Sequence, residues 1–316
     1  MTERIDLAKA VEMLTQAEDI LLICHKNPDG DTLGSAGALL HALRAMGKRV
    51  AIFCSDPIAA RYDYMQLELY DGSWEPSYVV AVDVAGTQLF GEAASAYLKR
   101  VDLCIDHHPS NSGYAQATLL DPDAGADAEL VYELIGQLPV EFTPVMADCL
   151  YTGVSTDTGC FKFANTTPRT HHIAAELMER GASFVKLNEL LFESKSQRRL
   201  AIEQIALSHL EYHFDGLCAL MYVTRDEIER TGADSNDLEG ITGIPRMIEG
   251  VVVGITMRQL ESGSYKVSVR TAGEIDACKI CAALGGGGHI RAAGCEFFGN
   301  LENAKAAVLA EVKKQI

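Results

Sequence analysis

Acidic and histidine residues follow short apolar runs at four places in the first half of the chain. Carboxylates and imidazoles bind divalent cations, and a pair of such cations supports hydrolytic chemistry. The residues are His25, Asp29 and Asp31 after Ile20–Cys24, Asp83 after Tyr78–Val82, Asp106, His107 and His108 after Val101–Ile105, and Asp157 after Leu150–Ser155. The pattern therefore predicts a metal centre.

The apolar runs have to bring these polar residues together for such a centre to form. Short apolar runs that alternate with helical stretches are typical of parallel strands buried on both faces. Ligands of such sheets bind just beyond the carboxyl ends of the strands. If all four runs are strands of one sheet, at least four carboxylates and two imidazoles meet along one edge. Their mutual repulsion would then require bound cations.

Asp83 is the predicted bridge of this centre. A carboxylate has two oxygens, and paired ions in hydrolytic sites lie roughly 3.5–4 Å apart. In the loop after Cys24, Pro28 and Gly30 predict a tight turn that lets positions 25, 29 and 31 face one pocket. The alternative is a polar loop in which Asp31 only caps the next helix.

Neighbouring polar residues are expected to orient the ligands. Asp106 is a candidate acceptor that fixes the ring of His107. The carboxylate of Asp157 is expected to accept hydrogen bonds from Thr156 and Thr158. Three further acids near a predicted strand end are expected to be helix caps and solvated residues outside the metal set: Asp121, Asp123 and Asp127.

The composition predicts a soluble protein with a large core. Of 316 residues, 48% are hydrophobic, nine are cysteines, and the formal net charge is −17. Scattered cysteines favour a reducing compartment, and without a signal core or a spanning segment we expect a cytoplasmic protein away from membranes. The charge argues against binding of long duplex nucleic acid, which needs many basic residues, but leaves a short anionic ligand open.

The order of helical and strand patterns predicts two α/β domains. A parallel-sheet domain is expected over residues 1–193, a linker helix over 194–210 and a smaller α/β domain over 211–316. Hairpins turned at 215–216 and 261–264 mark the second domain, and Lys48–Cys54 is a further expected strand. Helices are predicted over Asp6–Ala17, Ser35–Met46, Thr87–Arg100, Ala126–Gln137, Pro144–Tyr151, Pro168–Gly181, Ser194–Ser208, Asp276–Leu284 and Leu301–Lys314.

The ordered motifs of the whole chain resemble those of the DHH phosphoesterases, which are named for an Asp-His-His triplet. The matching motifs are His25-xxx-Asp29-Gly-Asp31, the isolated Asp83, Asp106-His107-His108 and Thr156-Asp157-Thr158-Gly159. Near the C-terminus, the glycines at 285–288, followed by His289, are similar to the substrate-binding signature of the DHH-associated domain found in one branch. Without this similarity, a glycine run would be typical of a flexible linker.

The resemblance implies an enzyme whose cleft lies between two lobes and whose first lobe holds two Mn²⁺ ions, with Mg²⁺ or another divalent ion as the alternative. Mixed imidazole and carboxylate ligation favours manganese over magnesium. One ion would be held by His25, Asp29 and Asp83, and the other by Asp31, Asp83, His107 and Asp157. The implied catalytic residues are Asp83 and His108, and the implied substrate-binding residues are Arg270, Gly286, Gly287, Gly288, His289 and Asn111.

Within this family the chain most resembles the nanoRNase type, which trims very short oligoribonucleotides and often dephosphorylates 3′-phosphoadenosine 5′-phosphate. The expected partner is a short single-stranded RNA or a nucleotide, and the oligomeric state, including a homodimer, stays open. Alternatives are a single-strand DNA exonuclease or a cyclic or linear dinucleotide phosphodiesterase of the same family. A nucleotide sensor without catalysis is a further alternative, although a full ligand set and 7% aromatic residues do not favour it.

Overall fold

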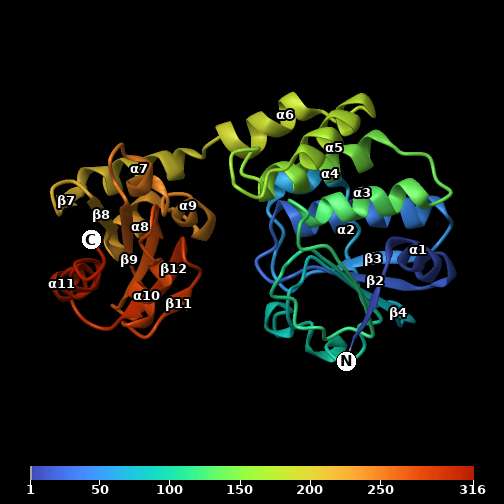
Figure 1. Ribbon diagram of the computed structural model, residues 1–316, viewed down its shortest axis with the longest axis horizontal. Coiled ribbons are helices and arrows are strands. Elements are labelled where there is room, and N and C mark those ends of the chain that lie inside the picture. The colour runs from blue at the N-terminus through green and yellow to red at the C-terminus, as the bar shows by residue number, and fades with distance from the viewer. Residues whose placement is uncertain (1) are drawn as a thin grey trace. The chain divides into compact units, whose positions relative to one another are not determined.

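Six parallel strands form the sheet of the first unit, in the order β1-β6-β5-β4-β2-β3. The structure, a computed structural model, describes residues 2–316 as two units, one ending at Ser194 and the other covering Lys195–Ile316 (Figure 1). The strands of the first sheet are β1 (Glu3–Ile5), β2 (Ile20–Ile23), β3 (Val50–Phe53), β4 (Tyr78–Val82), β5 (Leu103–Asp106) and β6 (Ala117–Leu120). Every residue of β2 is buried, which explains its unbroken apolar run.

Strand β2 marks the place where the strand order reverses. The chain passes from β2 to β3 on one side and later returns to β4 on the other side. At such a point the loops leaving the carboxyl ends of neighbouring strands diverge and form a crevice for ligands. The runs before His25, Asp83 and His107 are the neighbouring strands β2, β4 and β5, as the sequence predicted.

The α-helices of the first unit are α1 (Leu7–Gln16), α2 (Gly30–Ala45), α3 (Asp127–Gln137), α4 (Pro144–Asp157), α5 (Pro168–Glu179) and α6 (Phe184–Asn188). Helices α2, α3 and α4 lie together over one face of the sheet (Figure 1). A Cβ added at Gly34 would lie 2.3 Å from the carbonyl oxygen of Cys149, and one at Gly153 would lie 2.7 Å from Oδ1 of Asp31. These glycines therefore allow α2 and α4 to pack closely beside the edge that carries the acids.

The fourth apolar run, Leu150–Ser155, is not a strand, and this prediction was wrong. It lies inside α4, which continues past the predicted end at Tyr151 to Asp157. The run contains Tyr151, Thr152 and Val154, which are residue types that favour strands. In the helix, the hydroxyls of Thr152 and Thr156 donate to carbonyl oxygens one turn earlier, at 2.8 Å in both cases. These bonds satisfy the polar groups inside the packed interface.

The predicted helix over Thr87–Arg100 is also wrong. This segment covers the other face of the sheet and contains two short 3-10 turns, η2 (Thr87–Leu89) and η3 (Ser95–Tyr97). Between the turns, Gly91 has a φ of +75°, and a Cβ there would lie 2.6 Å from the side chain of Ser55. The left-handed glycine interrupts the helix that the surrounding residues favour.

The remaining helix predictions of the first unit are confirmed except at their ends. Helices α1, α3 and α5 occupy the predicted segments, and the side chains of Thr143 and Thr167 cap α4 and α5. Short turns elsewhere are η1 (Ala60–Met65), η4 (Glu189–Glu193) and, in the second unit, η5 (Ile244–Met247). Within residues 2–316, the helices are too short or too polar to span a bilayer.

The second unit has a mixed sheet in the order β11-β12-β10-β9-β8-β7. Its strands are β7 (Glu211–His213), β8 (Cys218–Val223), β9 (Val253–Gln259), β10 (Tyr265–Thr271), β11 (Gly287–Gly288) and β12 (Ala292–Phe297). Both predicted hairpins are confirmed, because β7 pairs antiparallel with β8 and β9 pairs antiparallel with β10. Strand β12 was not expected. The predicted fold class, a parallel-sheet α/β domain followed by a smaller α/β domain, is confirmed.

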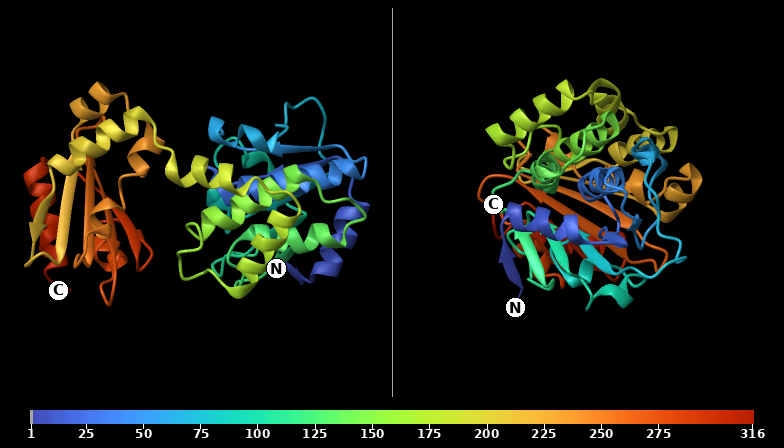
Figure 2. Two further views of the ribbon diagram at one scale, coloured as in Figure 1. Left: turned by 90° about the horizontal axis from the view of Figure 1, so that it is seen from above. Right: turned by 90° about the vertical axis from the view of Figure 1, so that its right-hand side faces the viewer.

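Helices cover both faces of the second sheet (Figure 2). The helices are α7 (Gln197–Ser208), α8 (Arg225–Thr231), α9 (Ser235–Glu239), α10 (Ala277–Ala282) and α11 (Leu301–Val312). Helices α10 and α11 share a core with Val267 and Val269 of β10, whereas α7, α8 and α9 share a core with Met221 and Val223 of β8. Helix α7, which was expected to link the domains, is thus packed within the second unit.

Candidate metal centre

Helix α2 begins directly after the loop that leaves β2, at Gly30 and not at the predicted Ser35. Asp29 caps this helix, because its Oδ1 accepts the backbone N–H of Asp31 at 3.0 Å. The alternative in which Asp31 is the cap is therefore wrong. Burial opposes ionisation of Asp29, but its contact with His25 and the helix amides outweigh burial and lower the pKa of this carboxyl.

Asp31 lies in the first turn of α2 and is 1% exposed. The N-terminus of α3 holds its carboxylate, since the backbone N–H of Asp127 donates to Oδ2 at 2.6 Å and that of Ala128 to Oδ1 at 3.0 Å. The hydroxyl of Ser35 donates to Oδ1 at 3.3 Å. Burial and then the charge of Asp157 nevertheless raise the pKa of Asp31 to about 7. Full ionisation of Asp31 at neutral pH therefore needs additional positive charge near its carboxylate.

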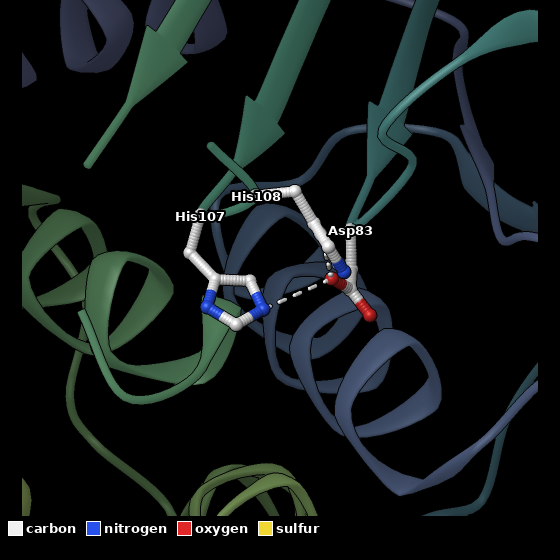
Figure 3. A group of neighbouring side chains, drawn as sticks. All are labelled: Asp83, His107 and His108. Carbon is white, nitrogen blue, oxygen red and sulfur yellow. Dashed lines mark ion pairs between the residues drawn. The ribbon is translucent and has the colours of Figure 1, made fainter. Parts of the chain in front are cut away.

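Asp83 follows β4, and its carboxylate points toward the rings of His107 and His108 (Figure 3). Its φ of +59° is rare for a residue other than glycine, and it is 3% exposed. Its Oδ2 lies 3.7 Å from Nε2 of His25, and its Oδ1 lies 3.6 Å from Nε2 of His107. Burial, followed by the charges of Asp31 and Asp29, raises the pKa of Asp83 well above its usual range. The two oxygens thus face two different sets of ligands.

His25 and His107 present the same ring nitrogen to the carboxylates. Nδ1 of His25 lies 2.8 Å from the carbonyl oxygen of Lys26, and Nδ1 of His107 lies 3.1 Å from that of Ala124. A proton on Nδ1 that is donated to the carbonyl leaves the lone pair of Nε2 free for a cation. The expectation that Asp106 orients His107 is therefore wrong, because a backbone carbonyl holds that ring.

Asp106 instead holds His108, with Oδ1 at 2.8 Å from Nδ1 of the ring. This hydrogen bond is the main cause that raises the pKa of His108, whose side chain is 41% exposed. Asn111, which was expected to bind substrate, donates from Nδ2 to Oδ2 of Asp106 at 2.5 Å and accepts the backbone N–H of Gly113. Because these bonds occupy its amide, Asn111 fits a role in positioning Asp106.

Asp157 reaches the site as the last residue of α4. Its Oδ2 lies 3.8 Å from Nε2 of His107 and accepts a hydrogen bond from Nδ2 of Asn165 at 3.1 Å. The prediction that Thr156 and Thr158 orient the carboxylate of Asp157 is wrong, because both hydroxyls donate to carbonyl oxygens of the helix. Asn165 takes this role, and a lone asparagine in a loop gives no sequence signal of it.

The six predicted metal ligands form two groups, and Asp83 links them. In each group, one ligand atom per residue lies within 4.8 Å of the others, and the groups are His25, Asp29 and Asp83, and Asp31, His107 and Asp157. A third overlapping group joins Asp83, His107 and His108. The buried Oδ1 of Asp83 makes no hydrogen bond, and burial followed by repulsion from neighbouring acids raises the pKa values of Asp31 and Asp83. Divalent cations would bind the unpaired oxygen of Asp83 and neutralise the charges of the acids, so these residues fit a metal pair.

The prediction that Asp127 is a solvated acid is wrong. It is the first residue of α3, it is 0% exposed, and neither carboxylate oxygen has a hydrogen-bond partner. Burial, followed by the charges of Asp31 and Asp106, raises its pKa well above the usual range. Asp123, by contrast, is exposed as expected. Burial of Asp127 results from packing of α3 against distant parts of the chain, which local sequence does not encode.

The predicted substrate-binding residues of the second unit lie near one another. Arg270 on β10 and the β11 hairpin at Gly287–Gly288 line a hollow of about 270 Å³. A Cβ added at Gly286 or Gly288 would lie 2.2 Å or 2.6 Å from a carbonyl oxygen of β12, whereas the space around Gly287 is open. His289 follows the hairpin and is exposed. The glycines therefore bring bare backbone close to Arg270.

Comparison with known proteins identifies both units. The model of the DHH family, N-terminal domain, matches residues 19–154, and that of the DHHA1 domain matches residues 218–316. A bifunctional oligoribonuclease and PAP phosphatase NrnA from Thermus thermophilus is 35% identical over 98% of this chain and 93% of its own length. A protein of the same name from Bacillus subtilis is 24% identical over 91% of this chain and 92% of its own length.

Solved structures share the same architecture. An exopolyphosphatase-related protein from Bacteroides fragilis superimposes with a TM-score of 0.89 at 25% identity, covering 98% of this chain and 95% of its own. RecJ from Thermus thermophilus in complex with Mn²⁺ has a TM-score of 0.57 at 16% identity, over 98% of this chain and 54% of RecJ, and shows only the common fold. The chain therefore belongs to the DHH family and carries a DHHA1 domain in its second unit.

Proposed function

We propose that this protein is a divalent-cation-dependent phosphodiesterase that hydrolyses short oligoribonucleotides and also dephosphorylates 3′-phosphoadenosine 5′-phosphate. The observation that carries the proposal is the position of Asp83, whose two oxygens face His25 on one side and His107 on the other. The names of the two NrnA relatives, which match over nearly the whole chain, support the substrate class.

The two metal ions would share Asp83 as a common ligand. His25 and Asp29 would hold one ion with it, and Asp31, His107 and Asp157 would hold the other. Four carboxylates balance the charge of two divalent cations, and the mixture of imidazole and carboxylate favours Mn²⁺. Such a pair lowers the pKa of a bound water and stabilises charge on the phosphoryl group.

His108 is the proposed proton donor or phosphate contact. Asp106 fixes its ring through Nδ1, which leaves Nε2 available to substrate on a side chain that is 41% exposed. Because the Asp106 hydrogen bond raises the pKa of His108, the protonated ring persists to higher pH than a free histidine. A protonated Nε2 can donate to a phosphate oxygen or to the leaving oxygen of the ester.

Arg270, Gly286–Gly288 and His289 are the proposed contacts for the rest of the substrate. The guanidinium of Arg270 suits a phosphate because it offers paired N–H donors, and it faces the same hollow as the hairpin glycines. Backbone amides of the hairpin can approach a ligand closely where side chains are absent. These contacts favour a substrate that is small and anionic.

A side-by-side assay with Mn²⁺ tests this function. The substrates are a 5′-phosphorylated RNA dinucleotide, a longer RNA, single-stranded DNA, 3′-phosphoadenosine 5′-phosphate and pyrophosphate. We expect the highest kcat/KM for the dinucleotide, followed by the bisphosphate nucleotide. A preference for long single-stranded DNA would instead support an exonuclease of the same family, and binding without turnover of any substrate would support a sensor.

A further inference from the structure

One short segment of the first unit, Ala124–Glu129, holds ligands of a single metal group. The carbonyl oxygen of Ala124 lies 3.1 Å from Nδ1 of His107. Further along the segment, the first two backbone N–H groups of α3 donate to the carboxylate of Asp31. We call Ala124–Glu129 the support segment.

The third ligand of the same group, Asp157, is held through an asparagine. Nδ2 of Asn165 donates to Oδ2 of Asp157 at 3.1 Å and to the carbonyl oxygen of Gly125 at 2.8 Å. Asn165 therefore joins Asp157 to the support segment. The three ligands of one metal group, Asp31, His107 and Asp157, thus share a single support.

The other metal group is held by different parts of the chain. Nδ1 of His25 contacts the carbonyl oxygen of Lys26 in its own loop, and Asp29 accepts hydrogen bonds from the first backbone N–H groups of α2. Neither contact involves the support segment. A displacement of the support segment should therefore disturb the group of His107 more than the group of His25.

A buried acid at the end of the support segment binds two residues of α5. Glu129 is 0% exposed, and its Oε1 accepts a hydrogen bond from the hydroxyl of Thr170 at 2.6 Å. Its Oε2 lies 3.4 Å from Nε of Arg169. Neither of these last two atoms makes a hydrogen bond, so the attraction between them is that of opposite charges. These contacts tie the support segment to α5.

The support segment is closely packed at Gly125. A Cβ added there would lie 2.8 Å from three oxygens, which are the carbonyl oxygen of Asn165, Oε1 of Glu129 and Oγ1 of Thr170. The backbone of Gly125 thus lies between the loop that holds Asp157 and the side chain that binds α5. In such a dense interior, a shift of Glu129 would also move Gly125 and Asn165.

Arg169 pairs with two further acids, but these are partly exposed. Its Nη1 lies 2.5 Å from Asp121 and its Nη2 lies 2.9 Å from Glu133, whose side chains are 34% and 43% exposed. Ion pairs in contact with water contribute little, whereas loss of the partner of a fully buried charge is costly. Among the three acids, Glu129 therefore depends most on Arg169.

We propose that Glu129 and Arg169 are positioning residues for one metal ion, the ion whose ligands include His107, and not for the ion whose ligands include His25. This inference rests on the metal pair of the proposed function. It adds two residues that contact none of the metal ligands directly and act through the support segment.

Titration calorimetry of the metal-free, full-length protein with Mn²⁺ tests the proposal. The wild-type protein should bind two ions, and His25→Ala and His107→Ala, which should each weaken mainly one ion, assign the two binding steps. Glu129→Gln removes the charge but keeps an acceptor for the hydroxyl of Thr170. The affinity for the ion at His107 should fall about tenfold, as is typical for groups that orient metal ligands, and the affinity for the ion at His25 should be unchanged.

Glu133→Gln is the matched control. It removes the same charge from another partner of Arg169 on the same helix, at a position in contact with water, and should leave both affinities unchanged. Arg169→Lys keeps the positive charge and should retain most of the affinity that Arg169→Gln loses. Thermal unfolding in EDTA on the same preparations should show a cooperative transition for each variant, which separates loss of position from loss of fold.

Equal weakening of both ions in Glu129→Gln, or no weakening of either, would overturn the positioning role, and so would the same loss in Glu133→Gln. Because the titration contains no substrate, its result is independent of the reaction. A protein that binds Mn²⁺ as expected but hydrolyses no oligoribonucleotide would contradict the proposed function and leave this inference standing. A wild-type protein that binds fewer than two ions would overturn both.

Discussion

The candidate metal centre of the first unit and the hollow beside Arg270 in the second unit differ in how the chain holds their side chains. At the metal centre, backbone groups fix the ligands, as the carbonyl of Lys26 does for His25 and the α3 amides do for Asp31. At the hollow, the alternation of side chains along β10 sets the direction of Lys266 and Arg270, which both line it. Rigid ligands suit chemistry that tolerates little displacement, whereas long cationic side chains suit binding of a small anion. Changes in the first region should therefore affect kcat and metal content, and changes in the second should affect KM.

The largest effect is expected for Asp83→Ala. Because both oxygens of Asp83 face ligand groups, the substitution should weaken both ions and lower kcat by more than about a hundredfold, beyond the loss typical of an outer partner. Activity with Mn²⁺ and metal content by atomic emission are the measurements. Asp123→Ala, at an exposed acid, is the control. Near-normal turnover of Asp83→Ala would refute the bridging role.

Arg270→Ala tests the region in the second unit. Loss of its charge-assisted hydrogen bonds should raise KM by about 10- to 100-fold while both metal ions remain bound. Steady-state kinetics and metal content measured on the same preparation distinguish the two regions. The control is Arg230→Ala, at an exposed arginine of α8. Loss of metal from Arg270→Ala would mean that this residue supports the metal centre.

Asn165→Ala sharpens the comparison within the metal centre. Asn165 holds Oδ2 of Asp157 at 3.1 Å, so its removal should free that carboxylate and weaken metal binding by about 10-fold or more. Metal titration followed by activity should reveal one weakened ion and one of normal affinity. Equal weakening of both ions would argue that the two ligand groups do not act separately.

The effect of pH on the metal-free protein follows from the raised pKa values. The pKa of Asp31 rises from 3.8 to about 7, and those of Asp83 and Asp157 are also raised, so the folded chain binds more protons than the unfolded chain in this range. The free energy of unfolding should therefore fall as pH rises from about 4 to about 7. His25 and His108, whose pKa values are raised, act in the same direction near pH 6.5.

Bound metal should reverse this pH trend. The ligands must lose their protons to bind, so the increase in Tm caused by Mn²⁺ should grow between about pH 5.5 and about pH 8. Thermal unfolding with Mn²⁺ and with EDTA at each pH gives the difference. A stabilisation by Mn²⁺ that stays constant over this range would contradict ligation by these residues.

The smallest effects are expected from two neighbouring glycines. Gly287 has open space for a Cβ, so Gly287→Ala should leave Tm unchanged and raise KM a few-fold by narrowing the hollow beside Arg270. At Gly288, φ is +146° and a Cβ would lie 2.6 Å from a backbone oxygen, so Gly288→Ala should lower Tm. Equal losses of Tm in both variants would show that the hairpin responds as a structural unit.

Sequence motifs predicted which residues gather at the candidate metal centre better than they predicted the elements that carry these residues. The residue types and the order of His25, Asp83 and His107 follow from what a cation binds and where parallel strands end. Asp157 was predicted to follow a strand because the run before it has strand-like residues, yet packing through Gly34 and Gly153 favours a helix there.

Roles that depend on distant packing were not predictable. Asn165 and Asp127 come near the other acids only after α3 and α4 pack against α2. The same is true of Asn111, whose amide donates to Oδ2 of Asp106. The ion pair of Arg169 with Glu129 likewise joins two helices, α5 and α3, that only the folded chain brings together.

The most direct test of the account is an anomalous-scattering map from crystals of the full-length protein soaked in Mn²⁺. We expect two peaks per chain, roughly 3.5–4 Å apart, with one carboxylate oxygen of Asp83 next to each. His25 should adjoin one peak, and His107 and Asp157 should adjoin the other. A single peak, or peaks remote from Asp83, would contradict the metal pair on which the proposed function depends.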